Sequence, residues 1–581
     1  MGKRSVIRWT FWLAMLAGWG IFAAEEPVVV HLDVLPYTQP DHGYALVVGQ
    51  VVNRDTKREH VVRLSLPDQY GILGVVSREV SVAPGTQQTV LLPVPASIMA
   101  YIGECRVTLD GRRRLEPLAV NLQTQGALGK AHHQEAYSAV LVSRQVSYDA
   151  LERALKHPVE GQMQVKLQRS ERELDTWPGR WLAYSAYDAV AVTATDWQRA
   201  HESVRDALWR YAECGGVLIV VGNFVPPAPV ELVQEGGDAR SPYRILEVGL
   251  GRCAVFPSPQ VIHPIAGDVL RDHMQRSRAM VWPRHANAAA SHDLAPVVDK
   301  IKLPLGLALS VLMVFALVAG PVNMALLRRK NRSVWLFWIT PLLGVLTSGL
   351  IVLSMLLGEG VTARVRTEGF TLLDERVGRA TSLGVDGLYC PLRPRQGLLY
   401  SYDTEVTLGQ VGEDFIGQNR QRDVVWDEGQ HLQGDWVPAR VPTYFRLRAS
   451  ESRSERLGLV RDGSGLAVVN GLGARIEHLM LMDFDGQVYE TTDVAAGVQT
   501  APLAATKFRP PPPRSLAQVA LWDECWNFNR YSTLPNSGLL RPGSYIARIE
   551  GTPFLASGLR GSAQREERSV VFGRMRQEEV R

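Results

Sequence analysis

Cysteine is scarce in this chain of 581 residues. An odd number of cysteines, spread this thinly, is not the disulfide framework of a small secreted domain. Cys214 with Cys253, or Cys390 with Cys525, could pair if the fold brings them together. Otherwise we expect buried thiols without disulfide partners. The five cysteines are Cys105, Cys214, Cys253, Cys390 and Cys525.

A large net charge is also lacking. The chain has 63 Lys and Arg against 59 Asp and Glu, a formal charge of +4. So small an excess on so long a chain does not favour nucleic acid as a partner. The hydrophobic content of 46% is ordinary for globular proteins, which excludes both a disordered chain and a transporter with many spans.

Several catalytic and metal-binding motifs are absent from the sequence. It contains no G-x-S-x-G, no H-E-x-x-H and no phosphate-binding G-x-x-x-x-G-K-[ST]. The histidines before residue 300 follow no spacing typical of a zinc site. We therefore predict no catalytic residue, no metal site and no cofactor. Those histidines include His263, His273, His285 and His292.

The N-terminus has the pattern of an export signal. Lys3, Arg4 and Arg8 form a basic head, and an apolar run over residues 9–24 ends in small residues. This pattern predicts a signal peptide over 1–24, or an N-terminal anchor that is not cleaved. Either one would place the following region outside the cytoplasm.

Two long uncharged runs stand out in the middle of the chain, over residues 303–327 and 333–358. Each has about the 20 residues that a helix needs to cross a bilayer. We therefore predict a two-helix transmembrane hairpin in the inner membrane. The loop 328–332 carries Arg328, Arg329, Lys330 and Arg332, and the positive-inside rule places such a loop in the cytoplasm. Both large regions would then be extracytoplasmic, in the periplasm.

Pro321 and Asn323 interrupt the first apolar run. Proline is expected to kink the helix. The asparagine side chain could form a hydrogen bond between helices, or line a path for an ion.

The remaining sequence predicts a multidomain protein that combines α/β and all-β units. Short alternating strands over 25–127 favour an immunoglobulin-like β-sandwich. Strands alternating with helices over 136–260 favour a doubly wound, flavodoxin-like α/β domain. A juxtamembrane segment over 261–302 follows it. Strand patterns return over 359–507 as one or two antiparallel β domains, and a proline-rich spacer opens the last segment, 508–581.

Three stretches carry a family resemblance. "WLAYSAYDAVAVTATDWQRA" with "ALWRYAECGGVLIVVG", then "GPVNMALLRRKNRSVWLFWITP" and "HLMLMDFDGQVYETTDVAAG", resemble membrane-anchored bacterial proteins with a glutamine-amidotransferase-like, flavodoxin-type domain. An active amidotransferase would need a cysteine on the turn after a strand and a downstream His-x-Glu. Here the strand "GVLIVVG" runs into Asn223, and the His-x-Glu motif at 133–135 lies upstream. The resemblance therefore implies a fold without the activity.

These observations favour a non-enzymatic, membrane-anchored protein of the cell envelope. It would bind a protein partner or ligand through its extracytoplasmic domains, and its partners would be the membrane and other envelope or membrane proteins. An envelope hydrolase of another type, or an extracytoplasmic accessory subunit of a transporter, are the alternatives.

Overall fold

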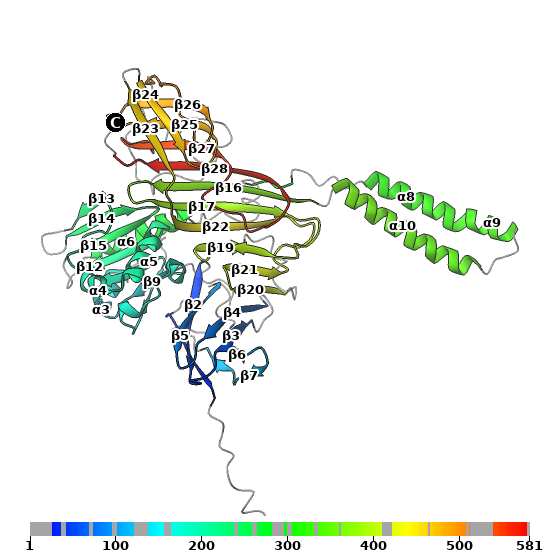
Figure 1. The fold of residues 1–581 in the computed structure, drawn as a ribbon, viewed down its shortest axis with the longest axis horizontal. Helices are drawn as coiled ribbons and strands as arrows, with labels where there is room; N and C mark the ends of the chain where they lie inside the picture. Colours follow the sequence, from blue (N-terminus) through cyan, green and yellow to red (C-terminus); the bar gives the residue numbers. More distant parts are fainter. Residues whose placement is uncertain are drawn as a thin grey trace, which may run out of the picture.

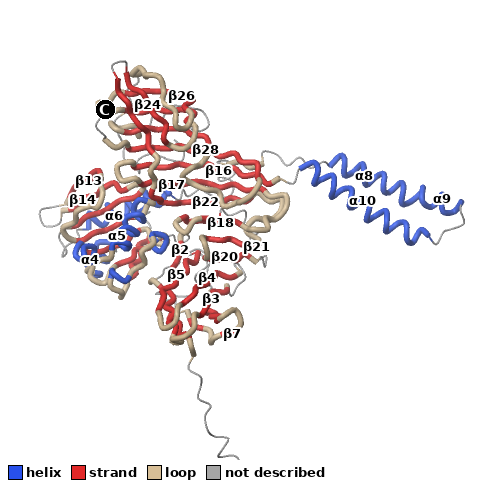
Figure 2. Tube along the Cα trace, in the orientation of Figure 1, coloured by secondary structure: helices blue, strands red, loops and turns tan. Residues whose placement is uncertain are grey.

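The protein is a β-rich body with a pair of antiparallel helices that projects from it (Figure 1). Figure 2 shows the helices confined to one side unit of the body and to the projecting pair. In the computed structural model the described residues are 26–36, 42–68, 74–95, 102–120, 137–155, 164–237, 242–257, 264–281, 295–298, 305–329, 335–359, 362–408, 421–462, 465–506, 511 and 538–577. The predicted signal peptide and the proline-rich segment lie almost entirely outside these ranges.

Two sheets contain the N-terminal strands. Apolar residues alternate with polar ones along β3, so that one face of its sheet is buried. The first sheet has the order β1 (Val28–Val34), β2 (Tyr44–Asn53), β5 (Gln87–Pro95). The second has the order β18 (Leu398–Tyr400), β21 (Gln430–Gly434), β20 (Arg422–Trp426), β4 (Val75–Val82), β3 (His60–Pro67), β6 (Glu104–Leu109), β7 (Arg113–Arg114), with β8 (Leu118–Ala119) paired to β6.

The second sheet joins distant parts of the chain. Val424 and Val425 of β20 pair in parallel with Val76 and Ser77 of β4. The indole N–H of Trp426 donates to the backbone oxygen of Pro93 at 2.9 Å. The N-terminal strands therefore share their core with strands that follow the projecting helices.

The side unit is a seven-stranded sheet covered by helices. Its strand β12 is buried at every position, as a central parallel strand should be. The strand order is β10 (Gln164–Arg169), β9 (Tyr137–Val142), β11 (Ala189–Thr193), β12 (Val217–Val221), β15 (Gly251–Phe256), β14 (Tyr243–Val248), β13 (Glu231–Gly236). The helices are α3 (Tyr148–Leu155), α4 (Ala194–Arg199), α5 (Glu202–Glu213) and α6 (Pro264–Val281), with short 3-10 turns η1 (Leu174–Thr176) and η2 (Trp181–Tyr184).

The flavodoxin-like prediction for this unit is wrong. Strands β9 to β12 and β15 are parallel, but β13, β14 and β15 form an antiparallel meander with no helix between them. A doubly wound fold would connect each of these strands through a helix. The protein as a whole is mostly β.

An eight-stranded sheet, the large C-terminal sheet, forms most of the rest of the body. Strands β16 and β28, the first and last of this region, pair in parallel along their whole length. The order is β19 (Thr404–Leu408), β22 (Thr443–Ser452), β17 (Arg379–Tyr389), β16 (Ala363–Asp374), β28 (Ala563–Arg574), β27 (Ser544–Glu550), β25 (Ile476–Met482), β26 (Val488–Val494). A separate hairpin consists of β23 (Arg456–Asp462) and β24 (Gly465–Gly471).

The projecting pair, which we call the arm, runs from Leu305 to Glu359. It contains α8 (Leu305–Leu317), a π-helical turn (Val318–Val322), α9 (Asn323–Arg329) and α10 (Leu336–Glu359).

The prediction of a transmembrane hairpin in this region is wrong. Across the described ranges, no helix combines the length and the apolar character needed to span a membrane. The regular helix α8 has 13 residues, which is about 20 Å against the ~30 Å of a hydrocarbon core. The π-helical turn that contains Pro321 follows α8 and interrupts its regular α-helical geometry. The apolar composition of the run did not reveal this turn.

Candidate binding cleft

A cleft opens where the side unit meets the large C-terminal sheet. Its volume is about 360 Å³. One wall is helix α5, and the other is the turn between β16 and β17 together with the chain after β12. The residues that line it are Trp197, Glu202, Arg205, Asp206, Trp209, Glu213, Pro227, Ala228, Val377 and Arg379.

Helix α5 contributes one continuous face to the cleft. Glu202, Asp206, Trp209 and Glu213 are spaced by three or four residues, so they lie along the same side of the helix. Gly215, with φ +104°, follows the end of this helix. A left-handed residue at this position is the usual way to terminate a helix. The local sequence therefore fixes which side chains reach the deep end of the cleft.

The cleft has an aromatic floor. Trp209 lies edge-to-face with Trp197 at 6.5 Å between ring centroids, and Trp197 does the same with Phe224 at 5.4 Å. All three side chains are buried. Aromatic pairs in this geometry add to the stabilisation from burial alone, so these three rings hold α4, α5 and the chain after β12 together.

Glu213 lies at the deep end of the cleft. Its carboxylate accepts a hydrogen bond from the Ser450 hydroxyl at 3.2 Å and lies 3.5 Å from Nε of Arg379. Burial raises the pKa of Glu213 to about 7, against the opposing effect of the Arg379 charge. This carboxyl group therefore changes its protonation near neutral pH.

Arg379 connects the two walls. Besides its contact with Glu213, it donates a hydrogen bond to Asp206 on α5 at 2.8 Å. Asp206 also forms an ion pair with Arg210 one turn later, at 2.8 Å. The position of Arg379 at the start of β17 is therefore set by two carboxylates of the side unit.

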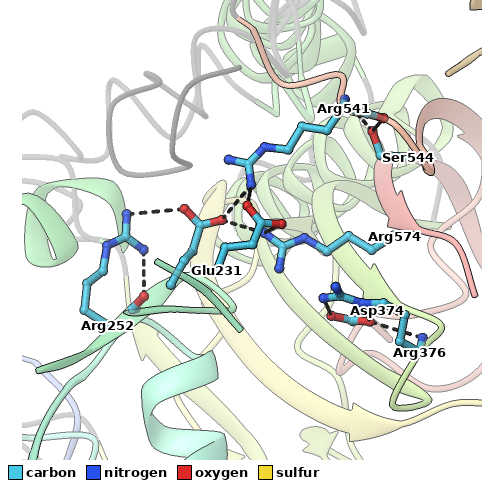
Figure 3. A network of polar contacts seen from close by, with 9 residues as sticks. Glu231, Arg252, Asp374, Arg376, Arg541, Ser544 and Arg574 are labelled. Carbon is cyan, nitrogen blue, oxygen red and sulfur yellow. Dashed lines mark hydrogen bonds and ion pairs between the residues drawn. The ribbon is translucent and has the colours of Figure 1, made fainter. Parts of the chain in front are cut away.

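A network of arginine and glutamate side chains continues the same junction beyond the cleft (Figure 3). Arg574 contacts Glu247 at 2.5 Å, Arg541 contacts Glu231, and Arg252 lies 3.8 Å from Glu247. Arg541 and Arg574 come from the C-terminal region, whereas the other residues belong to the side unit. The junction is therefore held by buried charges as well as by apolar packing.

Another buried ion pair lies next to the C-terminal end of helix α5. Nε of Arg448 donates to Glu405 at 2.6 Å, and its Nη1 donates to the backbone oxygen of Cys214 at 3.0 Å. The guanidinium also stacks over the Trp181 ring at 5.3 Å. The strands β19 and β22 are thereby attached to the C-terminal end of α5.

Neither thiol of the side unit is available for catalysis. Cys214 caps the C-terminus of α5, Cys253 lies inside β15, and both are fully buried. Burial raises the pKa of each thiol, so the reactive thiolate is disfavoured. The expectation of buried thiols without disulfide partners is confirmed for these two residues. The four cysteines within the described ranges are free thiols.

The residues predicted to set topology lie far from the cleft, on the arm. Pro321 is in the π-helical turn and exposed, and Arg329, at the end of α9, is also exposed. Arg328 lies in α9, whereas Lys330 and Arg332 are outside the described residues. Asn323 is buried, and its amide nitrogen has no hydrogen-bond partner in the described part of the chain.

The sequence contained only part of the signal for the cleft. The charged residues on the cleft side of α5 could have been recognised, because Glu202, Asp206 and Glu213 recur at helical spacing, although Glu213 and Trp209 on that side are buried. Arg379, however, is 166 residues beyond Glu213 in the chain, as their numbers show. No local pattern connects two such residues. Among the described residues, no group of three or more His, Cys, Asp or Glu could hold a metal ion.

Comparisons with known proteins give no family. No family model matches the chain, and no curated protein sequence matches it. One solved structure that it resembles is a Paenibacillus sp. cycloisomaltooligosaccharide glucanotransferase complexed with cycloisomaltoheptaose, at 12% identity and a TM-score of 0.15, with 33% of this chain and 27% of that chain covered. Similarity this weak supports no conclusion about fold or function. The resemblance to amidotransferase-like proteins therefore stays a prediction.

Proposed function

We propose that this chain is a non-enzymatic binding protein of the cell envelope that holds a protein partner through its apolar arm. The envelope location rests on the export signal predicted over residues 1–24, which the structure does not describe. The arm is the observation that carries the proposal, because its apolar side chains face outward rather than into the body.

Exposed apolar side chains concentrate on the arm. Of the 22 large apolar side chains that are exposed among the described residues, 16 lie between Leu309 and Val352. Phe337 and Trp338 are 78% and 73% exposed. Together they present an apolar area on the order of 1,000 Å², which is larger than the patches of a few hundred Å² on ordinary monomers. Surfaces of this size mark binding sites.

The chemistry of the arm favours a partner built from apolar helices. Helix α8 contains no charged residue, and α10 has one, Glu359 at its last position. Small residues such as Gly344 and Gly349, with open space around them, allow close approach of another helix. The partner is therefore expected to present an uncharged helical surface of comparable length.

Charge introduced on the arm tests this proposal. We expect Leu312→Glu with Leu346→Glu to abolish co-isolation of one specific protein partner, since a buried carboxylate would be unpaired in the interface. The control is Leu392→Glu, which puts the same charge on a body residue that is 60% exposed. The identified partner, purified separately, should bind the wild-type chain and the control but not the double variant. Equal binding by all three would reject the proposal.

A hydrolase is the second candidate, and one observation favours it. Glu213 has a pKa of about 7 and lies beside Arg379 in a cleft, which suits a general acid or base. If the chain were a hydrolase, Glu213→Gln would remove a measurable activity on glycan, peptide or amide substrates. Glu202→Gln, at the mouth of the same cleft, is the matched control.

A further inference from the structure

Three buried polar side chains between β15 and α6 have polar atoms without hydrogen-bond partners in the described structure. They belong to Arg252, His273 and Ser277. Arg252 and Glu247 are cross-strand neighbours on β15 and β14. His273 and Ser277 are four residues apart, hence on one face of α6. Burial lowers the pKa of the His273 imidazole, and the positive charge of nearby Arg252 lowers it as well, to about 4. The imidazole is therefore neutral.

The guanidinium of Arg252 has N–H donors that lack hydrogen-bond acceptors in the described structure. Its side chain is fully buried, and Nη1 donates to the backbone oxygen of Gly251 at 2.7 Å. Nε and Nη2 have no hydrogen-bond acceptor in the described structure, and the same is true of Nδ1 of His273 and the hydroxyl of Ser277. Unsatisfied buried donors are rare in folded proteins, because each one forfeits its interaction with water.

The charge of Arg252 is also poorly balanced. Within the described structure, its ion-pair partner Glu247 lies 3.8 Å away and is contacted more closely by Arg574, at 2.5 Å. Arg541 lies 3.7 Å from the same carboxylate (Figure 3). An arginine stays protonated even when it is buried. A buried charge without an adequate counter-charge is strongly unfavourable, and a water molecule could complete the hydrogen bonds but not the charge.

We propose that a small monovalent anion of the chloride class binds beside Arg252, between β15 and α6, with Nε and Nη2 of Arg252 and the hydroxyl of Ser277 as donors. A monovalent anion matches the charge count of this junction, because Arg252, Arg541 and Arg574 face only the two carboxylates of Glu231 and Glu247 in the described structure. The anion would stabilise the junction in Figure 3, independently of any partner of the arm.

Chloride dependence of the folded full chain tests this site. In a mild non-ionic detergent, at constant ionic strength, the melting temperature should be about 2 °C or more higher in sodium chloride than in sodium gluconate, by preferential binding to the folded state. Arg252→Gln should remove this difference. Arg276→Gln should keep it, because Arg276 is half exposed and pairs with Asp272 at 2.9 Å. Equal melting temperatures in the two salts for the wild type would overturn the proposal.

A second measurement does not depend on the folding of the Arg252 variant. Crystals of the wild-type chain grown with bromide should show an anomalous peak within hydrogen-bond distance of Nε or Nη2 of Arg252. The Ser277→Ala variant should need a several-fold higher chloride concentration for half of its stabilisation. Density beside Arg252 that refines as water and gives no anomalous peak for bromide would contradict the site. So would a Ser277→Ala variant that needs the same chloride concentration as the wild type for half of its stabilisation.

Discussion

Glu213→Gln should change the pH dependence of stability in a predictable direction. Burial raises the pKa of this carboxyl from 4.5 to about 7 in the folded protein. The folded state therefore holds the proton more tightly than the unfolded state. This stabilisation is fully present below pH ~4.5 and is lost as the pH rises through 7.

The size of the effect follows from the shift. A difference of about 2.5 pKa units corresponds to about 3 kcal/mol of folding free energy between low and high pH. Glutamine keeps the shape of the protonated carboxyl and cannot ionise. At pH 5 the unfolded-state carboxyl is already mostly ionised, so only part of this effect falls between pH 5 and pH 8. Over that range the stability of Glu213→Gln relative to wild type should rise by roughly 2–3 kcal/mol, in addition to a constant loss from the missing contact with Arg379.

The assay is urea unfolding of both proteins at the two pH values, followed by tryptophan fluorescence. Glu368 and Glu375 also have raised pKa values of about 7, but their contribution cancels in the difference between the two proteins. Glu202→Gln is the control, since it removes an exposed carboxylate from the same helix. If the difference between Glu213→Gln and wild type were the same at pH 5 and pH 8, the burial argument would be refuted.

Three further predictions follow from the packing around α5. Arg448→Met should destabilise the protein by about 3–5 kcal/mol in urea unfolding, because it leaves the carboxylate of Glu405 buried without its partner; adding Glu405→Leu should recover much of this loss. Gly251→Ala should lower the melting temperature by several degrees, because a Cβ there would overlap backbone oxygens of α5 and the following turn, whereas Gly369→Ala, with ordinary contacts, should be tolerated. Alkylation of native Cys214 at pH 7 should be far slower than after denaturation, since burial raises its pKa.

Local elements were readable from the sequence where one physical signal dominated. The apolar run 217–221 predicts a central parallel strand, and β12 is one. The period of apolar residues before Gly215 predicts α5 and its end. Such elements depend on the burial of their own side chains, so a short window contains the information.

Tertiary relations were not readable in this way. The pairing of Val76 with Val424 joins segments separated by the side unit and the arm, and the sequence has no local mark for it. The prediction of a doubly wound domain failed because the meander of β13 to β15 follows four parallel strands whose pattern suggested more of the same. The cleft depends on Arg379 reaching α5, which is likewise a long-range contact.

For the arm, the prediction from the sequence failed for a different reason. Apolar composition over 303–358 predicts burial in an apolar environment but not which one. Two membrane-spanning helices were the interpretation drawn from it, whereas the described helices do not meet that criterion. The irregular turn over 318–322 depends on backbone geometry that hydropathy does not encode.

The most direct test of the arm as a protein-binding surface is site-specific photo-crosslinking from Leu346, which is 61% exposed. The probe is placed there in the full chain, in cells of the organism that encodes it, and the products are identified by mass spectrometry. The expected result is one protein other than this chain, crosslinked from Leu346 and from Leu312 but not from Leu392 on the body. Crosslinks only to lipid, or only to a second copy of the chain, would contradict the proposed function.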